Sequence, residues 1–131
     1  MRRIMLFADT SFLVASLRVN DENHLRAKAI AEGMNEKMMI SDHVLSELLT
    51  LLAYKEGNKT AYQAGKRLIG SDVLIVYAIS EDIPLALELM KTTPKLSMCD
   101  ALSATIMKKL RIKKILSFDS DFDALGFERI C

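Results

Sequence analysis

The chain has 131 residues, which fits one domain over residues 1–131 that folds without disulfides or a structural metal. Half of the residues (50%) are hydrophobic and 27% are charged, as in a typical globular protein. A net charge of +1 excludes a global electrostatic preference for nucleic acids or membranes. An anionic substrate would therefore have to be attracted locally, by charged patches or by metal.

In chain order, the hydrophobic patterns predict a strand at Ile4–Ala8, helices at Ser11–Leu17 and Glu22–Met34, a strand at Met38–Ile40, helices at His43–Glu56 and Thr60–Ile69, a strand at Val73–Ile79, helices at Ile83–Lys91 and Met98–Leu110, and strands at Lys114–Ser117 and Phe127–Ile130. Strands separated by helices indicate an α/β fold with a parallel sheet. The strands are continuously apolar, which indicates burial of both faces of the sheet under helices. Asn20 or Asp21 is the expected cap of the second helix.

The cysteines and the apolar runs bear on the compartment. Cys99 and Cys131 match neither a C-x-x-C motif nor a zinc site, and unpaired thiols indicate a reducing compartment, so we expect a cytoplasmic protein. The apolar run Ile4–Ala8 is too short for a signal peptide. No run approaches the ~20 apolar residues of a membrane helix, so no membrane association is expected.

Asp9 directly follows the first predicted strand, in the segment Phe7-Ala8-Asp9-Thr10-Ser11. Ligands of open parallel sheets bind outside the carboxyl ends of the strands, where the strand order reverses, and this carboxylate lies at such an end. The competing interpretation is a helix N-cap, because Asp, Thr and Ser all accept hydrogen bonds from the first helical amides. Taken alone, Asp9 fits the two interpretations equally well.

Glu47 lies inside the helix predicted over His43–Glu56. Its neighbours along the helix row are Val44 and Leu51, so the carboxylate stands on a partly buried row. Buried carboxylates are costly unless they are paired or bind metal. Considered alone, Glu47 is better explained as a boundary residue whose carboxylate reaches water. For His43, in the first helical turn, we expect a neutral polar role rather than catalysis.

Asp100 lies near the start of the helix predicted over Met98–Leu110. Ser97 and Asp100 have the spacing of a capping box, and an acid in the first turn also suits the helix dipole. The small residues that follow, such as Ala101 and Ser103, leave space beside Asp100 for a ligand. The capping role and a ligand-binding role are compatible.

Three acids, Asp119, Asp121 and Asp123, alternate after the fourth predicted strand. Their spacing resembles a calcium-binding EF-hand loop, but Ala124 and Arg129 stand where that motif has Gly and Glu, so we reject an EF-hand. The local alternative is a polar turn in which aspartate side chains accept backbone hydrogen bonds.

Each acid alone has a structural explanation, whereas the combination indicates a site. Asp9 and Asp119 both follow predicted strands, so their carboxylates converge if those strands are neighbours in the sheet. Two ionised carboxylates about 4 Å apart repel by about 4 kcal/mol at an effective dielectric near 20, so such a cluster needs a cation or a raised pKa. Oxygen ligands without Cys or His select Mg²⁺ or Mn²⁺.

The chain resembles a PIN domain over essentially its whole length. The resemblance rests on an ordered set of segments with matching spacing: Phe7-Ala8-Asp9-Thr10-Ser11, Ser46-Glu47, Cys99-Asp100-Ala101 and Ile115-Leu116-Ser117-Phe118-Asp119-Ser120-Asp121-Phe122-Asp123. PIN domains are metal-dependent nucleases that act mostly on RNA. The resemblance implies a sheet of strand order 3-2-1-4-5, with the reversal between the first and fourth strands, where Asp9 and Asp119 lie.

The resemblance also implies a role for each polar residue by its position. The core acids are Asp9, Glu47, Asp100 and, as the fourth, Asp119. Of these, Asp9, Asp100 and Asp119 would hold Mg²⁺ or Mn²⁺, with Asp121 as an additional or substitute ligand. Glu47 would hold metal or orient the attacking water. Supporting hydroxyl groups are implied at Thr10, Ser11 and Ser117. Asp123 has no counterpart in the family, and we expect it to be structural.

The implied function is a Mg²⁺- or Mn²⁺-dependent endoribonuclease. Single-domain chains of this length are typical of the toxins of VapBC-type toxin–antitoxin pairs, so the implied partners are RNA, a small antitoxin protein and a second copy of the chain. Leu51, Tyr54 and Tyr62 are candidate contact residues, or ordinary boundary residues. Two alternatives stay open: a non-catalytic PIN-like interaction module, and a receiver-like signalling domain. The second would need a Lys after the last strand, and none follows Phe127–Ile130.

Five basic residues lie within the seven positions Lys108–Lys114. The segment leads from a helix into the fourth strand, at the opposite end from Asp119, so we interpret it as a cationic helix C-terminus favoured by the helix dipole. The other candidate RNA contacts, which the sequence does not rank, are Arg26, Lys55, Lys59, Lys66, Arg67 and Lys95. With 6% aromatic residues, the chain is poorly suited to a base-stacking platform.

Overall fold

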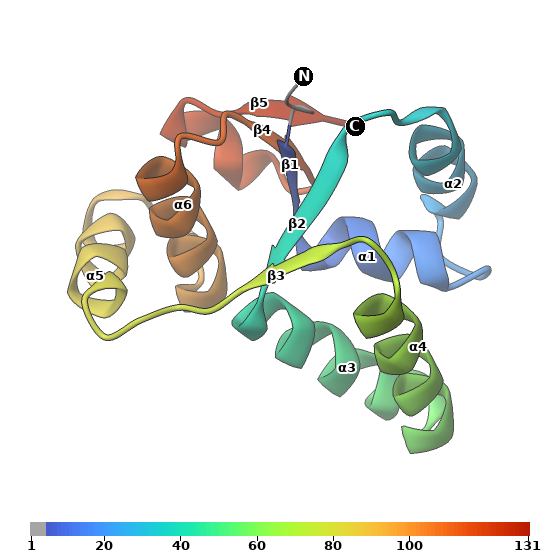
Figure 1. The fold of residues 1–131 in the computed structure, drawn as a ribbon. Helices are drawn as coiled ribbons and strands as arrows, with labels where there is room; N and C mark the ends of the chain where they lie inside the picture. Colours follow the sequence, from blue (N-terminus) through green and yellow to red (C-terminus); the bar gives the residue numbers. More distant parts are fainter. Residues whose placement is uncertain (1–4) are drawn as a thin grey trace.

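The computed structural model describes residues 5–131 and has a five-stranded sheet at its centre (Figure 1). The strands are β1 (Met5–Ala8), β2 (Lys37–Ser41), β3 (Leu74–Val76), β4 (Lys114–Leu116) and β5 (Glu128–Ile130). They lie in the order β3-β2-β1-β4-β5, and every neighbouring pair is parallel. The predicted fold class and strand order are confirmed; Ile4, the predicted start of the first strand, lies outside the described residues.

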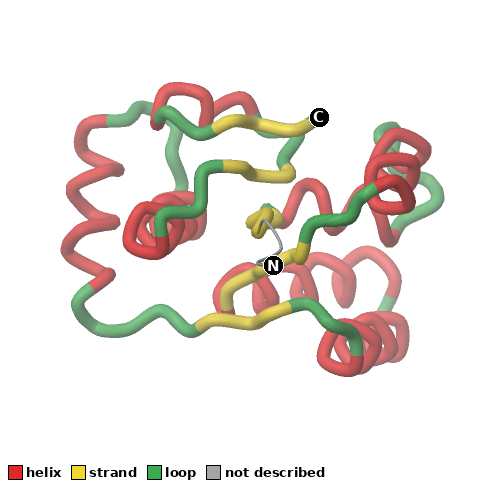
Figure 2. Tube along the Cα trace, turned by 45° about the horizontal axis from the view of Figure 1, so that its top comes forward, coloured by secondary structure: helices red, strands yellow, loops and turns green. Residues whose placement is uncertain are grey.

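The helices flank both faces of the sheet. They are α1 (Thr10–Leu17), α2 (His24–Gly33), α3 (Asp42–Glu56), α4 (Asn58–Gly70), α5 (Asp82–Thr92), α6 (Met98–Leu110) and the short 3₁₀ helix η1 (Ser120–Leu125). Figures 1 and 2 show α5 and α6 on one side of the sheet and α1, α2 and α4 on the other. Helix α3 packs against both α1 and α6, and it thereby connects α6 to the helices of the amino-terminal half of the chain. Across residues 5–131, none of the helices has the length and apolar character needed to span a membrane.

The central strand β1 is the most enclosed. Phe7 lies beside Met39 of β2 and Ile115 of β4, and both Phe7 and Ile115 are fully buried. The same core takes in further fully buried or nearly buried side chains: Phe12, Leu48, Leu52, Ile106, Met107 and Phe122. Burial stabilises the fold by roughly 25 cal/mol for each Å² of apolar surface removed from water. The ends of β1 and β4 are therefore held in fixed positions.

The third strand is shorter than the predicted Val73–Ile79. Strand β2 ends at Ser41, because α3 begins directly at Asp42. Ser41 pairs with Val76 of β3. Beyond Val76 there is no neighbouring strand to continue the ladder, and the chain enters a loop. The third strand is also an edge strand, in which Leu74 is 42% exposed. The expectation of burial on both faces is thus wrong for β3, and also for the other edge strand, β5, in which no residue is fully buried.

The second helix begins later than predicted. It starts at His24 rather than Glu22, and its N-cap position is Asn23. The carboxylate of Asp21 accepts a hydrogen bond from the Asn23 amide at 2.8 Å, which forms a turn before the helix. The predicted caps Asn20 and Asp21 are therefore wrong, because local Asx-type bonding competes with the helix for the same backbone.

A buried carboxylate, Asp82, joins α5 to α6. It is 1% exposed and accepts hydrogen bonds from Lys109 Nζ at 2.8 and 3.0 Å and from the Ile79 amide at 2.9 Å. Burial acts to raise the pKa of Asp82, but the Ile79 amide and the Lys109 ammonium outweigh it and hold the pKa below its ordinary value. The carboxylate is therefore charged near neutral pH.

Replacing Asp82 with Ala is expected to lower the free energy of unfolding by about 2 kcal/mol, because the Ile79 amide and Lys109 lose their acceptor. The control Glu88→Ala, at an exposed position of α5, is expected to change it by no more than about 0.5 kcal/mol. A depressed pKa stabilises the fold above the unfolded-state pKa of about 3.9, and this contribution is lost as pH falls through the folded-state pKa. Urea unfolding at neutral and acidic pH measures both effects, and equal stability of the two variants at neutral pH would contradict the prediction.

Candidate active site

A cleft of about 350 Å³ opens at the carboxyl ends of β1 and β4. Four predicted acids line it: Asp9 after β1, Glu47 on α3, Asp100 on α6 and Asp119 after β4. Figure 1 shows the amino-terminal ends of α1, α3 and α6 gathered at this edge of the sheet. The other lining residues are Thr10, Ser11, Val14, Asp21, Glu22, Asn23, Leu51, Ser97 and Phe118. The fold thus brings together acids that lie far apart in the sequence.

Asp9 occupies the N-cap position of α1, yet its side chain makes no capping hydrogen bond within residues 5–131. Its Oδ2 atom instead accepts hydrogen bonds from Ser11 Oγ and Ser117 Oγ, each at 2.9 Å. The residue is 3% exposed. Burial raises the pKa of Asp9, the two serine hydroxyls oppose that effect, and the charge of Asp119 adds to it. The side chain therefore belongs to the cleft rather than to the helix cap.

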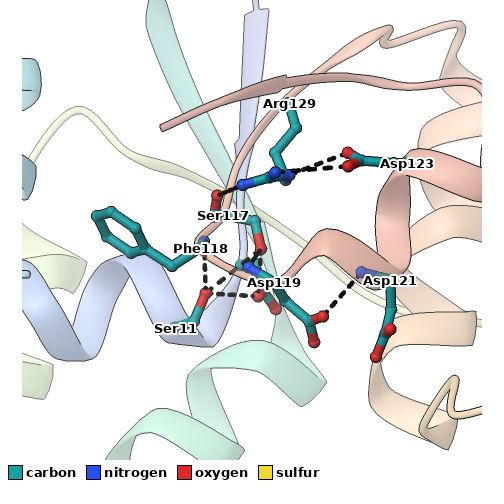
Figure 3. A network of polar contacts seen from close by, with 8 residues as sticks. Ser11, Ser117, Phe118, Asp119, Asp121, Asp123 and Arg129 are labelled. Carbon is teal, nitrogen blue, oxygen red and sulfur yellow. Dashed lines mark hydrogen bonds and ion pairs between the residues drawn. The ribbon is translucent and has the colours of Figure 1, made fainter.

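The two serines connect the loops that follow β1 and β4, as Figure 3 shows. Ser11 Oγ accepts a hydrogen bond from the Phe118 amide at 3.0 Å, and Ser117 Oγ accepts one from the Asp119 amide at 2.9 Å. Each hydroxyl thus donates to Asp9 and accepts from the loop after β4. Both serines therefore position the Asp9 carboxylate and the backbone of the loop at Phe118 and Asp119.

Asp119 and Asp121 have different positions in the acidic loop. Asp119 lines the cleft, and its Oδ1 atom accepts a hydrogen bond from the Asp121 amide at 2.9 Å, so the predicted polar turn forms at the start of η1 (Figure 3). Asp121 is not a lining residue of the cleft. The charge of Asp119 raises the pKa of Asp121, and the nearby charge of Lys95 opposes that effect. Asp123 forms an ion pair with Arg129 at 2.9 Å and also lies outside the cleft.

Asp100 combines the two roles that the sequence allows. Its amide donates to Ser97 Oγ at 3.1 Å, which caps α6, while its side chain lines the cleft. Burial first, then the charges of Asp9 and Asp119, and finally that of Glu47, raise the pKa of Asp100 to about 7. These neighbours act on Asp100 because all four carboxylates line the same cleft.

Glu47 is half-buried on α3, next to the fully buried Val44 and the partly buried Leu51. The prediction of a carboxylate on a partly buried row is confirmed. Beside it on α6 lies Cys99, whose thiol pKa is raised by burial and by the charges of Glu47 and Asp100. A thiol in these surroundings stays protonated and is not a nucleophile.

The cleft supplies the donor chemistry of a hard divalent cation. Its candidate ligands are oxygen atoms, and two of the carboxylates have raised pKa values. Thr10 is 4% exposed, and its Oγ1 atom has no hydrogen-bond partner among the described residues. In their present positions, however, no three His, Cys, Asp or Glu side chains of residues 5–131 form a group that could hold a metal ion. The cleft residues fit Mg²⁺ or Mn²⁺ in the kind of ligand atom that they offer and in the negative charge of their carboxylates.

Two further acids of the cleft, Asp21 and Glu22, were not predicted from the sequence as site residues. They line the cleft from the turn between α1 and α2, a position that no strand end predicts. No Lys or Arg of the described chain lines the cleft. The basic segment Lys108–Lys114 contributes instead to a separate pocket beside Phe127, and Lys109 is bound to Asp82.

Sequence comparisons identify relatives of the chain. The model of the PIN domain family matches residues 6–128. A protein named 23S rRNA-specific endonuclease VapC20, from Mycobacterium tuberculosis, is 31% identical over 128 residues, which cover 96% of this chain and 98% of that protein. A protein named VapC ribonuclease, from Archaeoglobus fulgidus, is 31% identical over 122 residues, which cover 87% of this chain and 76% of that protein.

Solved structures of similar fold also match the chain. The crystal structure of Mycobacterium tuberculosis VapC20, described as a sarcin-ricin loop cleaving toxin, has a TM-score of 0.87 at 31% identity, over 93% of this chain and 95% of that one. VapBC2 from Rickettsia felis, solved bound to a DNA fragment, shares the fold at 15% identity with a TM-score of 0.69, over 97% and 98% of the two chains. Together with the arrangement of its sheet and acids, these matches show that the chain belongs to the PIN-domain family.

Proposed function

We propose that this chain is a Mg²⁺- or Mn²⁺-dependent endoribonuclease that hydrolyses phosphodiester bonds in RNA. The observation that carries the proposal is the cleft, where four acids from four separate segments meet and the pKa values of Asp9 and Asp100 are raised. Carboxylates that repel one another at a shared site are typical of a cation-binding centre. Relatives that are 31% identical carry the names endonuclease and ribonuclease, which supports RNA as the substrate.

Asp9, Asp100 and Asp119 are the residues that would hold the ion, and Asp121 would supplement them from the edge of the cleft. A bound Mg²⁺ would polarise a phosphate oxygen and lower the pKa of a bound water. Ser11 and Ser117 already donate to Asp9, so their role is to orient that carboxylate. Thr10 Oγ1, which lacks a partner within the described chain, is the hydroxyl available to a ligand.

Glu47 is assigned to the attacking water. Its carboxylate would accept the proton that the water loses as the water oxygen bonds to phosphorus, and the bridging ester oxygen would leave and take up a proton from solvent water. Half-burial on α3 suits this task, because the side chain is anchored by apolar neighbours and still reaches the cleft. The products are one phosphate end and one hydroxyl end, as in hydrolysis of any phosphodiester.

A toxin of a type II toxin–antitoxin pair is the proposed biological setting, with a small antitoxin and a second copy of the chain as partners in a reducing cytoplasm. VapBC complexes of the same fold support an antitoxin partner. A groove of about 560 Å³ between α3 and α4 is lined by Tyr62, which is 66% exposed, and Tyr54 on α3 is 88% exposed. Uncovered apolar side chains of this kind are typical of protein contact surfaces.

Asp9→Asn is expected to reduce Mn²⁺-dependent cleavage of a broad RNA panel by at least about 100-fold, because the amide keeps the shape of the side chain and removes its charge. The control Asp123→Asn, in the acidic loop but outside the cleft, is expected to stay within about 2-fold of wild type. Undiminished cleavage by Asp9→Asn would contradict the assignment of Asp9 as a residue that holds the metal ion. Wild-type protein that binds Mn²⁺ in a calorimetric titration without cutting any RNA would favour the non-catalytic module instead.

Asp119→Asn is expected to lower the cleavage rate by about 100-fold and Asp121→Asn by less than about 10-fold, because only Asp119 lines the cleft. Asn at position 119 still accepts the amide hydrogen bond that starts η1, so the comparison isolates the charge. Initial rates at saturating RNA measure both variants. A larger loss from Asp121→Asn would reverse the assignment of the fourth acid.

Mn²⁺ binding is expected to weaken as pH falls below 7. The pKa of Asp100, raised to about 7, means that a proton occupies the carboxyl below that pH and must be displaced by the cation. Affinity should fall up to about tenfold per pH unit below 7 and level off about one unit above it. Calorimetric titrations of wild type and Asp100→Asn across this window test the expectation, since the variant should show a weaker dependence, with Asp9 as the remaining ligand of raised pKa. Wild-type affinity that does not change with pH would contradict it.

A further inference from the structure

A histidine and a serine lie one helical turn from two of the acids. His43 precedes Glu47 by four residues on α3, and Ser103 follows Asp100 by three residues on α6. Residues three or four apart share one face of a helix. The face of α3 that carries Glu47 therefore also carries His43, and the face of α6 that carries Asp100 also carries Ser103.

His43 connects the two helices through its ring. Its Nε2 atom lies 3.2 Å from Ser103 Oγ and 3.0 Å from Ser41 Oγ, within hydrogen-bond distance of both. Ser41 in turn accepts the Val44 amide and caps α3. Ser41 and Ser103 are fully buried, and the His43 side chain is 15% exposed. Polar links in such surroundings are costly to break, because water does not replace the lost partner.

This link lies where α3 and α6 meet. Among the described elements, α3 packs chiefly on α4, and α6 packs chiefly on α5, so the contact between α3 and α6 is the smaller one. The other ring nitrogen, Nδ1, has no hydrogen-bond partner within residues 5–131 and lies 3.7 Å from Asp42 Oδ1. Burial lowers the pKa of His43 against the opposing charge of Asp42, so the ring is neutral at pH 7 and acts by hydrogen bonding.

We propose that His43 and Ser103 are positioning residues that fix α3 against α6 and thereby set the separation of Glu47 and Asp100 in the cleft. Neither residue lines the cleft, so each acts through the acid on its own helix. The link to catalysis rests on the proposed function. A displacement of about 1 Å between catalytic groups costs on the order of 100-fold in rate, so a link one turn away is sufficient to matter.

Kinetics of single and double variants test this role. His43→Leu and Ser103→Ala are each expected to lower kcat for Mn²⁺-dependent RNA cleavage by about 10–100-fold and to leave KM within about 2-fold. The double variant should fall no further than His43→Leu, because both changes break one link. His43→Gln, whose amide nitrogen reaches the place of Nε2, should restore most of kcat. A kcat unchanged by His43→Leu, or a double variant in which the two losses multiply, would overturn the proposal.

Thr105→Val is the matched control. Thr105 is a buried hydroxyl residue of α6 that donates only to its own helix, at Ala101 O, over 2.8 Å. An equal kcat loss in this control would show a merely structural effect and contradict the positioning role. A crystal structure of Ser103→Ala gives a readout independent of activity, with an expected shift of Glu47 relative to Asp100 by about 1 Å. An unshifted pair would overturn the inference, whereas an inactive wild type with a shifted pair would overturn only the proposed function.

Discussion

The Asp9 carboxylate is held at the buried end of β1 by the hydroxyls of Ser11 and Ser117. Both serines also accept backbone amides of the loop after β4, at Phe118 and Asp119. One buried carboxyl group thereby connects, through Ser11 and Ser117, two loops that lie more than a hundred residues apart in sequence. The position of Asp119 follows from this network, and the shape of the cleft follows from both loops.

Mutual repulsion is the second constraint on the cleft. The charges of Asp9, Asp119 and Glu47 all raise the pKa of Asp100, and burial adds the largest effect. A fold tolerates such a cluster only where strong packing elsewhere compensates, and here the supporting core includes the fully buried Phe7, Ile115 and Phe122. Two of the acids, Glu47 and Asp100, come from helices that pack in two groups, α3 with α4 and α5 with α6. Contacts between these groups therefore bear directly on the geometry of the site.

The order of strands and helices was predictable because short apolar runs alternate with longer helical patterns along the chain. The end of β3 was not predictable. Tyr77 and Ile79 continue the apolar pattern of the strand, but β2 has already ended at Ser41, and no neighbour remains to pair with them. The length of a strand depends on its neighbour in space, and a local pattern contains no information about that neighbour.

The sequence by itself determined which acids are candidates, since Asp9 and Asp119 follow strands, Glu47 stands on an apolar helix row and Asp100 begins a helix. It left two interpretations of Asp9 open, a helix N-cap and a carboxylate of the site, because the residues around Asp9 are compatible with both. Only the tertiary structure decided that question, by supplying the hydroxyl of Ser117 from the loop after β4, 108 positions away. Convergence, burial and the raised pKa values are properties of the shared space between segments, so they exist only once the chain has folded.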